Sequence, residues 1–265
     1  MSYRIEAIRQ GITTAYLLAG SGPWVQIDAG YRGDLAKRER RLSRLGVDPA
    51  EVGYLILTHH HDDHVGYLAE LVRRTPGLRV MMGRETAALV RAGANNTANG
   101  GGLVTRRVAL LFSLMRRFRP GWDMAFPPYE VRESDIVVAD DDWRLPPELG
   151  IGARLVRTPG HTSDSVSLLT DEGDLFCGDA AANMLRPAGT RHATVFNEDM
   201  EAVYASWRRV LEAGVRRVYP AHGRPFGPEA LRRNLDRIRT VDLVPMFRPT
   251  NGPMTDESAL SAARL

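Results

Sequence analysis

A cluster of histidine and aspartate residues follows one short apolar run and has the spacing of a metal-binding motif. The apolar residues 55–57 lead into His59-His60-His61-Asp62-Asp63-His64. Imidazole and carboxylate groups are the ligands that borderline divalent metals favour. Because residues two apart in an extended segment point to the same side, His59 and His61 can converge on one ion while His60 points away. A turn after His61 would bring Asp63 and His64 toward a second ion.

Three later segments each place one ligand-type residue just after an apolar run with the character of a strand. They are Thr158-Pro159-Gly160-His161, Phe176-Cys177-Gly178-Asp179 and Tyr219-Pro220-Ala221-His222-Gly223. With these motifs in this order, the chain resembles the metallo-β-lactamase superfamily over about residues 12–240. An early strand that ends in Asp28 belongs to the same resemblance, and in the family this aspartate supports the site from behind the ligands.

The resemblance implies a centre of two divalent metal ions and assigns a ligand set to each. His59, His61 and His161 would bind one ion, Asp63, His64 and His222 would bind the other, and Asp179 would bridge them. Zinc is the preferred metal for such an imidazole-rich site, with iron or manganese as alternatives. Asp28 is expected to hydrogen-bond a ligand histidine, and Thr58 could do the same.

The chemistry implied by this centre is hydrolysis. Coordination to a metal lowers the pKa of water from about 15.7 toward 7, so a metal-bound hydroxide could attack an ester-like carbonyl at neutral pH. Asp63 could then pass a proton to the leaving group. No nucleophilic side chain is needed, so we interpret Cys177 as a core residue.

A lactone or a thioester with a hydrophobic portion is the substrate we expect. The main alternative is a persulfide dioxygenase-like oxidoreductase, in which a single iron would be held by His59, His161 and Asp179. Phosphodiesterase and β-lactamase activity on the same fold are further alternatives. We rank β-lactamase action lower because the N-terminus has no apolar export signal. Hydroxyacylglutathione hydrolase ranks lower because only a short segment follows His222.

Length and composition predict one cytoplasmic domain. The chain has 265 residues, and an α/β layered fold of this size can form a single unit. We expect a four-layer αββα sandwich over residues 1–250 and a frayed tail at 251–265. A net charge of +3 is too small to indicate nucleic-acid binding, and one cysteine excludes an internal disulfide. No apolar run is long enough to predict a transmembrane segment.

Residues 93–130 interrupt the alternation of strands and helices and predict an inserted lid. An Asn/Gly-rich stretch at 95–102 precedes a helix expected at 103–118, whose apolar positions include Phe112 and Met115. We expect these two residues to contact a small-molecule substrate, although the helix could instead pack on the core or form a homodimer contact. His192 follows Asp179 in a loop where family members contact substrate, and the alternative is an exposed loop histidine.

The remaining pattern predicts two β/α halves. Strands are expected at residues 3–8, 13–19, 23–28, 53–57, 78–82, 135–139, 153–157, 164–170, 174–178 and 216–219. Helices are expected at residues 34–44, 65–75, 84–92, 199–213 and 228–241.

Overall fold

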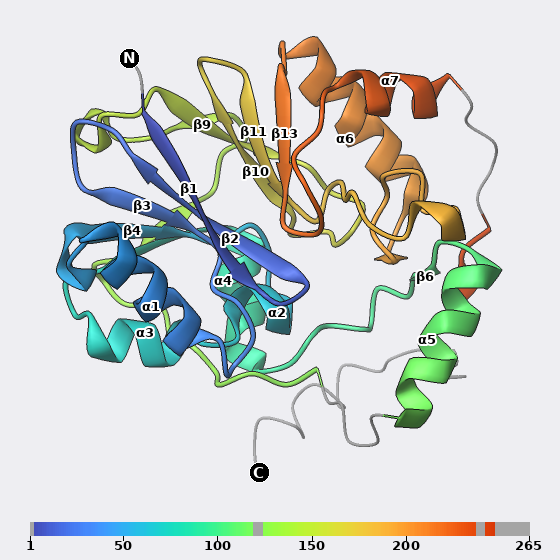
Figure 1. Cartoon of the computed structure of the whole chain (residues 1–265), viewed down its shortest axis with the longest axis horizontal. Helices are drawn as coiled ribbons and strands as arrows, with labels where there is room; N and C mark the ends of the chain where they lie inside the picture. The colour runs from blue at the N-terminus through green and yellow to red at the C-terminus, as the bar shows by residue number, and fades with distance from the viewer. Residues whose placement is uncertain (1–2, 119–123, 237–241, 247–265) are drawn as a thin grey trace.

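Two β-sheets face each other, and helices cover the outer face of each (Figure 1). The structure is a computed structural model that describes residues 3–118, 124–236 and 242–246. The first sheet has the order β1-β2-β3-β4-β5-β7 and the second the order β13-β11-β10-β9-β8. The arrangement is the expected four-layer αββα sandwich.

The first sheet is antiparallel from β1 to β3 and parallel from β3 to β7. Its strands are β1 (Arg4–Gln10), β2 (Thr13–Ala19), β3 (Trp24–Ile27), β4 (Val52–Ile56), β5 (Arg79–Gly83) and β7 (Ile136–Val138). The second sheet contains β8 (Trp143–Arg144), β9 (Ala153–Arg157), β10 (Val166–Thr170), β11 (Asp174–Gly178) and β13 (Arg217–Pro220). A small third sheet joins β12 (Phe196–Asn197), β6 (Gly102–Leu103) and β14 (Val244–Pro245).

The helices form the two outer layers. The first sheet is covered by α1 (Leu35–Leu45), α3 (Leu68–Arg74) and α4 (Arg84–Leu89), and the short α2 (Asp62–Val65) follows β4 at its end. The second sheet is covered by α6 (Met200–Glu212) and α7 (Glu229–Leu235), whereas α5 (Arg106–Phe118) lies at the rim of the molecule (Figure 1). No helix in the described ranges is long and apolar enough to cross a membrane.

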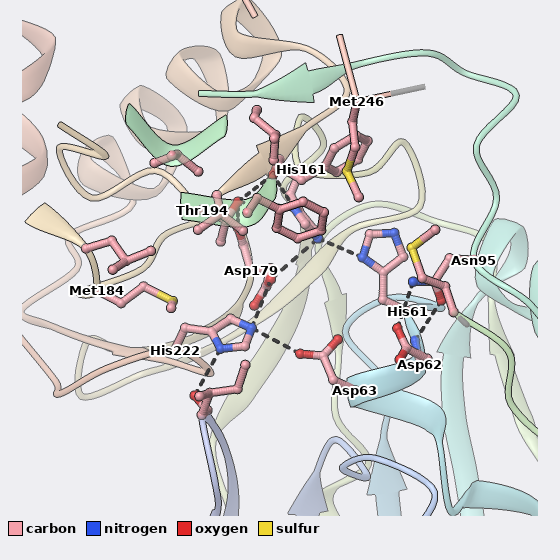
Figure 2. Close-up of a pocket in the computed structure, with 18 of the residues that line it drawn as sticks. His61, Asp62, Asp63, Asn95, His161, Asp179, Met184, Thr194, His222 and Met246 are labelled. Carbon is pink, nitrogen blue, oxygen red and sulfur yellow. Dashed lines mark hydrogen bonds and ion pairs between the residues drawn. The ribbon is translucent and has the colours of Figure 1, made fainter. Parts of the chain in front are cut away.

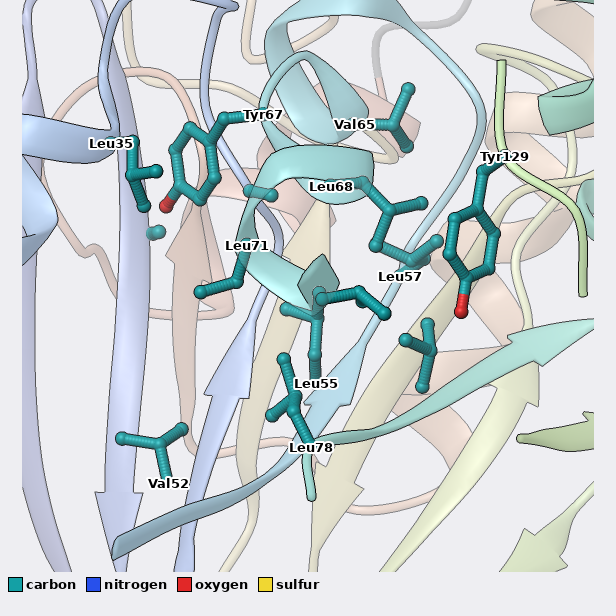
Figure 3. Packing of buried hydrophobic residues seen from close by; sticks show 14 of the residues in the cluster. Leu35, Val52, Leu55, Leu57, Val65, Tyr67, Leu68, Leu71, Leu78 and Tyr129 are labelled. Carbon is teal, nitrogen blue, oxygen red and sulfur yellow. The ribbon is translucent and has the colours of Figure 1, made fainter. Parts of the chain in front are cut away.

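Alternation along the central strands produces the layers, because successive side chains of a strand point to opposite faces. Leu55 and Leu57 pack against the helices of the first layer, as Figure 3 shows with Leu68 and Leu71 of α3. Ile56, between them, packs against the second sheet.

The outer face of the second sheet packs on α6. Val203, Trp207 and Val210 of that helix are buried in one cluster with Leu175 and Cys177 of β11. Burial raises the pKa of the Cys177 thiol, which is consistent with its interpretation as a core residue.

Several expected boundaries differ from the structure for identifiable reasons. The helix expected at 103–118 begins at Arg106, because Leu103 pairs with β12 and β14 and the Thr105 hydroxyl accepts a hydrogen bond from the Val108 amide (3.1 Å). The helix expected at 65–75 is divided into α2 and α3. The two-residue strands β6, β8, β12 and β14 were not predicted. Residues 237–241 of the last expected helix and the tail at 251–265 lie outside the described residues.

Trp207 gives a direct test of the packing between α6 and the second sheet. Its side chain is 2% exposed, and its indole N–H donates to the carbonyl oxygen of Ala180 (2.7 Å). We expect Trp207→Ala to lower the free energy of unfolding by about 3–5 kcal/mol in urea titrations. Leu110→Ala, at a position 63% exposed, should change it by less than about 0.5 kcal/mol. Equal midpoints for the two variants would contradict this packing.

Candidate metal centre

The ligand-type residues leave the ends of four strands that meet at one edge of the two sheets. His59 and its neighbours follow β4, His161 follows β9, Asp179 follows β11 and His222 follows β13. Backbone hydrogen bonds join the sheets here, from the Thr14 amide to Ala221 (2.8 Å) and from the Val166 amide to Thr58 (2.8 Å). Residues far apart in sequence are therefore held at one place.

All of the ligand residues that the family pattern assigns lie together, as Figure 2 shows for the five nearest the pocket. Three groups have ligand atoms within 4.8 Å of one another: His59, His61 and His161; His59, His64 and Asp179; and Asp63, His64 and His222. The Asp179 carboxylate lies between the first and third groups, 3.5 Å from Nε2 of His161 and 3.3 Å from Nε2 of His222. Because the second group joins His59 of one expected set with His64 of the other, the geometry places these residues at one centre, and their division into two ligand sets stays a prediction.

Asp28 and Thr58 support these ligands from behind. The Asp28 carboxylate accepts hydrogen bonds from the Thr58 amide (2.8 Å), the Thr58 hydroxyl (2.8 Å) and Nδ1 of His64 (2.9 Å). Asp28 adopts a positive φ of 61°, an uncommon conformation that directs its side chain toward the end of β4. Gly178 leaves room for this contact, because a Cβ there would lie 2.3 Å from the Thr58 hydroxyl oxygen.

Fixed acceptors determine which imidazole nitrogen carries the proton. Nδ1 of His161 lies 2.8 Å from the Phe196 carbonyl, and Nδ1 of His222 lies 3.0 Å from the Ile12 carbonyl. Because a carbonyl only accepts, we assign the proton to Nδ1 in both rings. We likewise assign a proton to Nδ1 of His64, which lies 2.9 Å from the Asp28 carboxylate. Nε2 of each of these rings therefore faces the centre, where a metal ion could replace its present partners.

Burial and neighbouring charges shift the pKa values at the centre in opposite directions. Burial, together with the surrounding imidazoles, lowers the pKa of His59 and His61. Burial opposes ionisation of Asp179 too, but the nearby imidazoles of His222 and His64 outweigh it and hold the carboxyl pKa well below its usual range. Burial also opposes protonation of His64 and His222, but the carboxylates of Asp63 and Asp179 outweigh it and raise the pKa of both imidazoles well above the usual value. A metal ion bound at the centre would therefore displace protons from these two rings.

Unpaired polar atoms at the centre show that these residues fit a divalent cation. Nε2 of His59, Nε2 of His64 and Oδ1 of Asp179 are buried without a hydrogen-bond partner, and the last two are 3.4 Å apart, the distance of a loose ion pair. Each such atom costs about 1–3 kcal/mol if it stays unpaired. Nδ1 of His61 also faces Nε2 of His161 at 2.9 Å, so a proton or a cation must lie between them. Nitrogen and oxygen donors of this kind suit zinc, iron or manganese.

The residues that alternate with the ligands point away from the centre and hold the start of the insertion. Nδ1 of His60 donates to Asp164 (3.0 Å), and its Nε2 accepts from the Asn96 amide (2.9 Å). The Asp62 amide donates to the Asn95 side chain, which donates back to the Asp62 carboxylate (both 2.8 Å). The Asn/Gly-rich stretch is therefore attached to the metal motif at its beginning.

A pocket of about 460 Å³ opens over the ligand residues, and we call it the metal pocket. Phe112 and Met115 of α5 line it as expected. Sequence reasoning did not identify other residues of its wall: Ile12, Tyr31, Met184, Leu185, Phe196 and Met246. Tyr31 is the one residue of this group that carries a phenol.

His192 is not among the described residues that line the metal pocket. Its ring packs on Phe226 at 4.4 Å between centroids, and its Nδ1 lies 3.1 Å from the Ala182 carbonyl. The side chain is buried rather than exposed. His192 is therefore neither a residue of the metal pocket nor an exposed loop histidine, so both expectations from the sequence are wrong.

Comparison with known proteins supports the same assignment of fold. The family model described as metallo-beta-lactamase superfamily matches residues 8–222. A crystal structure of an archaeal metallo-beta-lactamase superfamily protein, ST1585 from Sulfolobus tokodaii, superposes with a TM-score of 0.61 at 21% identity, covering 95% of this chain and 92% of that one. At this identity the likeness concerns the fold alone.

Curated relatives are distant. A beta-lactamase-like protein 2 homolog of Drosophila melanogaster is 24% identical over 80% of this chain and 58% of its own length. An atrochrysone carboxyl ACP thioesterase of Aspergillus fumigatus is 26% identical over 80% of this chain and 50% of its own. The chain thus spans about half the length of these relatives.

The ligand assignment predicts a contrast between two buried residues of the motif region. Asp179→Asn keeps the shape but removes the charge that offsets two cations, so we expect a loss of at least half of the bound metal by elemental analysis. His60→Ala should retain the metal and lose about 1–3 kcal/mol of stability, because Asp164 and the Asn96 amide lose a partner. The milder His60→Gln serves if the alanine variant does not fold. Metal loss in the His60 variants with full metal in Asp179→Asn would refute the assignment.

Proposed function

The chain belongs to the metallo-beta-lactamase superfamily, and on that premise we propose that it is a metal-dependent hydrolase of thioesters or lactones with an apolar acyl portion. The observation that carries the proposal is the metal pocket, whose apolar wall from α5 faces the His/Asp groups. Ligand sites of this volume that combine an apolar lining with a few convergent polar groups bind small molecules. The fungal thioesterase relative supports the same reaction class.

Two ligand sets would hold the metals, with zinc preferred and iron or manganese as alternatives. One set is His59, His61 and His161, the other is Asp63, His64 and His222, and Asp179 would serve both. Divalent cations bound there would polarise the substrate carbonyl and supply a water nucleophile at neutral pH. The surrounding hydrogen bonds to Asp28 and to main-chain carbonyls keep the ligand rings oriented before substrate arrives.

The chain's own side chains would manage the proton of the reaction. In hydrolysis, a water oxygen bonds to the acyl carbon, the C–S or C–O bond breaks, and a water proton ends on the leaving group. Burial raises the pKa of Asp63, but the imidazoles of His64 and His222 outweigh it and keep the carboxylate ionised. Asp63, held by the Thr13 hydroxyl (3.1 Å), is therefore our choice for carrying that proton.

Tyr31 is a second group of the metal pocket that can act on the substrate. Burial, followed by the charges of Asp63 and Asp62, raises the pKa of its phenol. The hydroxyl thus stays protonated at neutral pH and can donate a hydrogen bond to an oxygen of the substrate.

A substrate panel with metal-depleted and zinc-reconstituted protein tests the proposal. We expect hydrolysis of medium- or long-chain thioesters or aryl lactones, lost by a factor of about 100 or more after chelation and restored by zinc. Phosphodiesters and β-lactams should react poorly. Oxygen consumption with a persulfide, at one iron per chain, would instead establish the mono-iron oxidoreductase that uses His59, His161 and Asp179.

We propose that α5 acts as a lid, which predicts selectivity by chain length. Phe112→Ser and Met115→Ser should raise KM for long-chain substrates by roughly 10- to 100-fold and leave short-chain KM nearly unchanged, since each buried apolar side chain contributes about 1.5–3 kcal/mol. Leu114→Ser is the matched control, because this α5 residue is 49% exposed and is not among the described residues lining the metal pocket.

Melting temperatures separate the lid from its alternatives. A lid helix should tolerate both serine substitutions with little loss of stability. A large loss of melting temperature at unchanged chain-length preference would show that the helix is core or a dimer contact.

A further inference from the structure

A second pocket of about 410 Å³ lies beside the metal pocket and carries a cluster of cations. We call it the arginine pocket, after Arg106, Arg107 and Arg191 in its wall. Its other lining residues are small, apolar or neutral: Val104, Thr105, Ala188, Gly189, Thr190, Ala193, Met200, Tyr204, Trp207 and Asn234. No acidic side chain is among the described residues that line it.

The arginines of this pocket have no acidic partner among the described residues. Within the described ranges, no carboxylate forms an ion pair with Arg106, Arg107 or Arg191, whereas Arg232 nearby pairs with Glu229 (3.0 Å). Burial lowers the pKa of the neighbouring His192, and the charges of Arg186 and Arg233 lower it further. Two more cations therefore lie close to this loop. Exposed like charges gathered in this way repel one another, and an anionic ligand would relieve that repulsion.

The backbone holds Arg191 in a defined conformation at the wall of the arginine pocket. Arg191 has a φ of 49°, a left-handed conformation that is uncommon for a residue with a side chain. The Asn234 side chain donates to the Arg191 carbonyl (2.6 Å) and fixes this turn. On the opposite wall, the Thr105 hydroxyl donates to the Ala188 carbonyl (2.8 Å) and attaches the start of α5 to the same loop.

The two pockets share a wall. Leu103 and Val108 line the metal pocket, while Val104 and Thr105 between them line the arginine pocket. The loop after Asp179 is divided in the same way, since Leu185 lines the first pocket and Ala188 the second. A ligand that passes over this wall would have one end at the His/Asp groups and the other among the arginines.

We propose that the arginine pocket binds the phosphate-bearing nucleotide end of a coenzyme A-type thioester whose acyl end lies in the metal pocket. Guanidinium groups recognise phosphate oxygens through paired hydrogen bonds, and several phosphates match several arginines. The half-buried ring of Tyr204 adds an aromatic surface for a base. The inference rests on the proposed hydrolase function and selects thioesters over lactones, which carry no such anion.

Shape favours this small molecule over an acidic carrier protein. A concave site of about 410 Å³ is of the size that encloses part of a cofactor-sized ligand. A carrier protein would instead require a broad outward-facing surface. Preference for a thioester of an acyl carrier protein is therefore the result that would contradict the proposal.

Kinetics with two thioesters of the same acyl chain test the proposal in the zinc-loaded chain of 265 residues. Arg106→Gln combined with Arg191→Gln should raise KM for acyl-coenzyme A by roughly tenfold or more, since each charge-assisted hydrogen bond is worth at least a factor of ten. KM for the N-acetylcysteamine thioester, which lacks phosphates, should not change. Arg117→Gln is the control, because it removes the same charge from an exposed α5 position outside the arginine pocket.

Direct titration with free coenzyme A separates this inference from the proposed function. Calorimetric binding to the wild type that weakens in the double variant and with added NaCl supports the arginine pocket even if no thioester is hydrolysed. Hydrolysis of both thioesters with equal KM and no binding of coenzyme A overturns the inference while the hydrolase function stands. A lower KM for an acyl-carrier-protein thioester, with loss of that preference in the variants, would overturn it in favour of a protein partner.

Discussion

The carboxylate of Asp28 is the contact on which the geometry of the metal centre depends. It holds the Thr58 amide and hydroxyl just after β4, and it also holds Nδ1 of His64 in α2. The Thr58 hydroxyl in turn lies 3.1 Å from Nδ1 of His59. One buried carboxylate therefore orients a histidine from each ligand set. Gln26 fixes Asp28 itself by donating to its carbonyl oxygen (2.8 Å).

Side chains alternate in direction along the segment of residues 59–64, so the same segment also attaches the insertion. The ligand side chains face the metal centre, whereas His60 and Asp62 bind Asn96 and Asn95 of the insertion, and Asp62 also lines the metal pocket. The small sheet then brings β6 beside β12 and β14, so that α5 begins at the edge of the metal pocket. The metal centre and the attachment of the insertion thus depend on different side chains of the same short segment.

The residues that gather at the centre could be predicted from the sequence because each ligand segment begins within four residues of the end of a strand, and strand ends are locally encoded. Apart from Phe112 and Met115, the apolar wall of the metal pocket could not be predicted. Ile12 reaches the pocket from the β1–β2 turn and Met246 from the small sheet, and neither has a local pattern that indicates proximity to metal ligands. The burial of His192 depends on the ring of Phe226, which is distant in sequence. The start of α5 likewise depends on pairing of β6 with strands far along the chain.

Anomalous X-ray diffraction from crystals of the zinc-loaded protein, recorded on either side of the zinc edge, tests the central claim most directly. Our account predicts two peaks per chain, one among His59, His61 and His161 and the other among Asp63, His64 and His222, with Asp179 between them. A single peak held by His59, His161 and Asp179, with Asp63 and His222 uncoordinated at saturating metal, would contradict it.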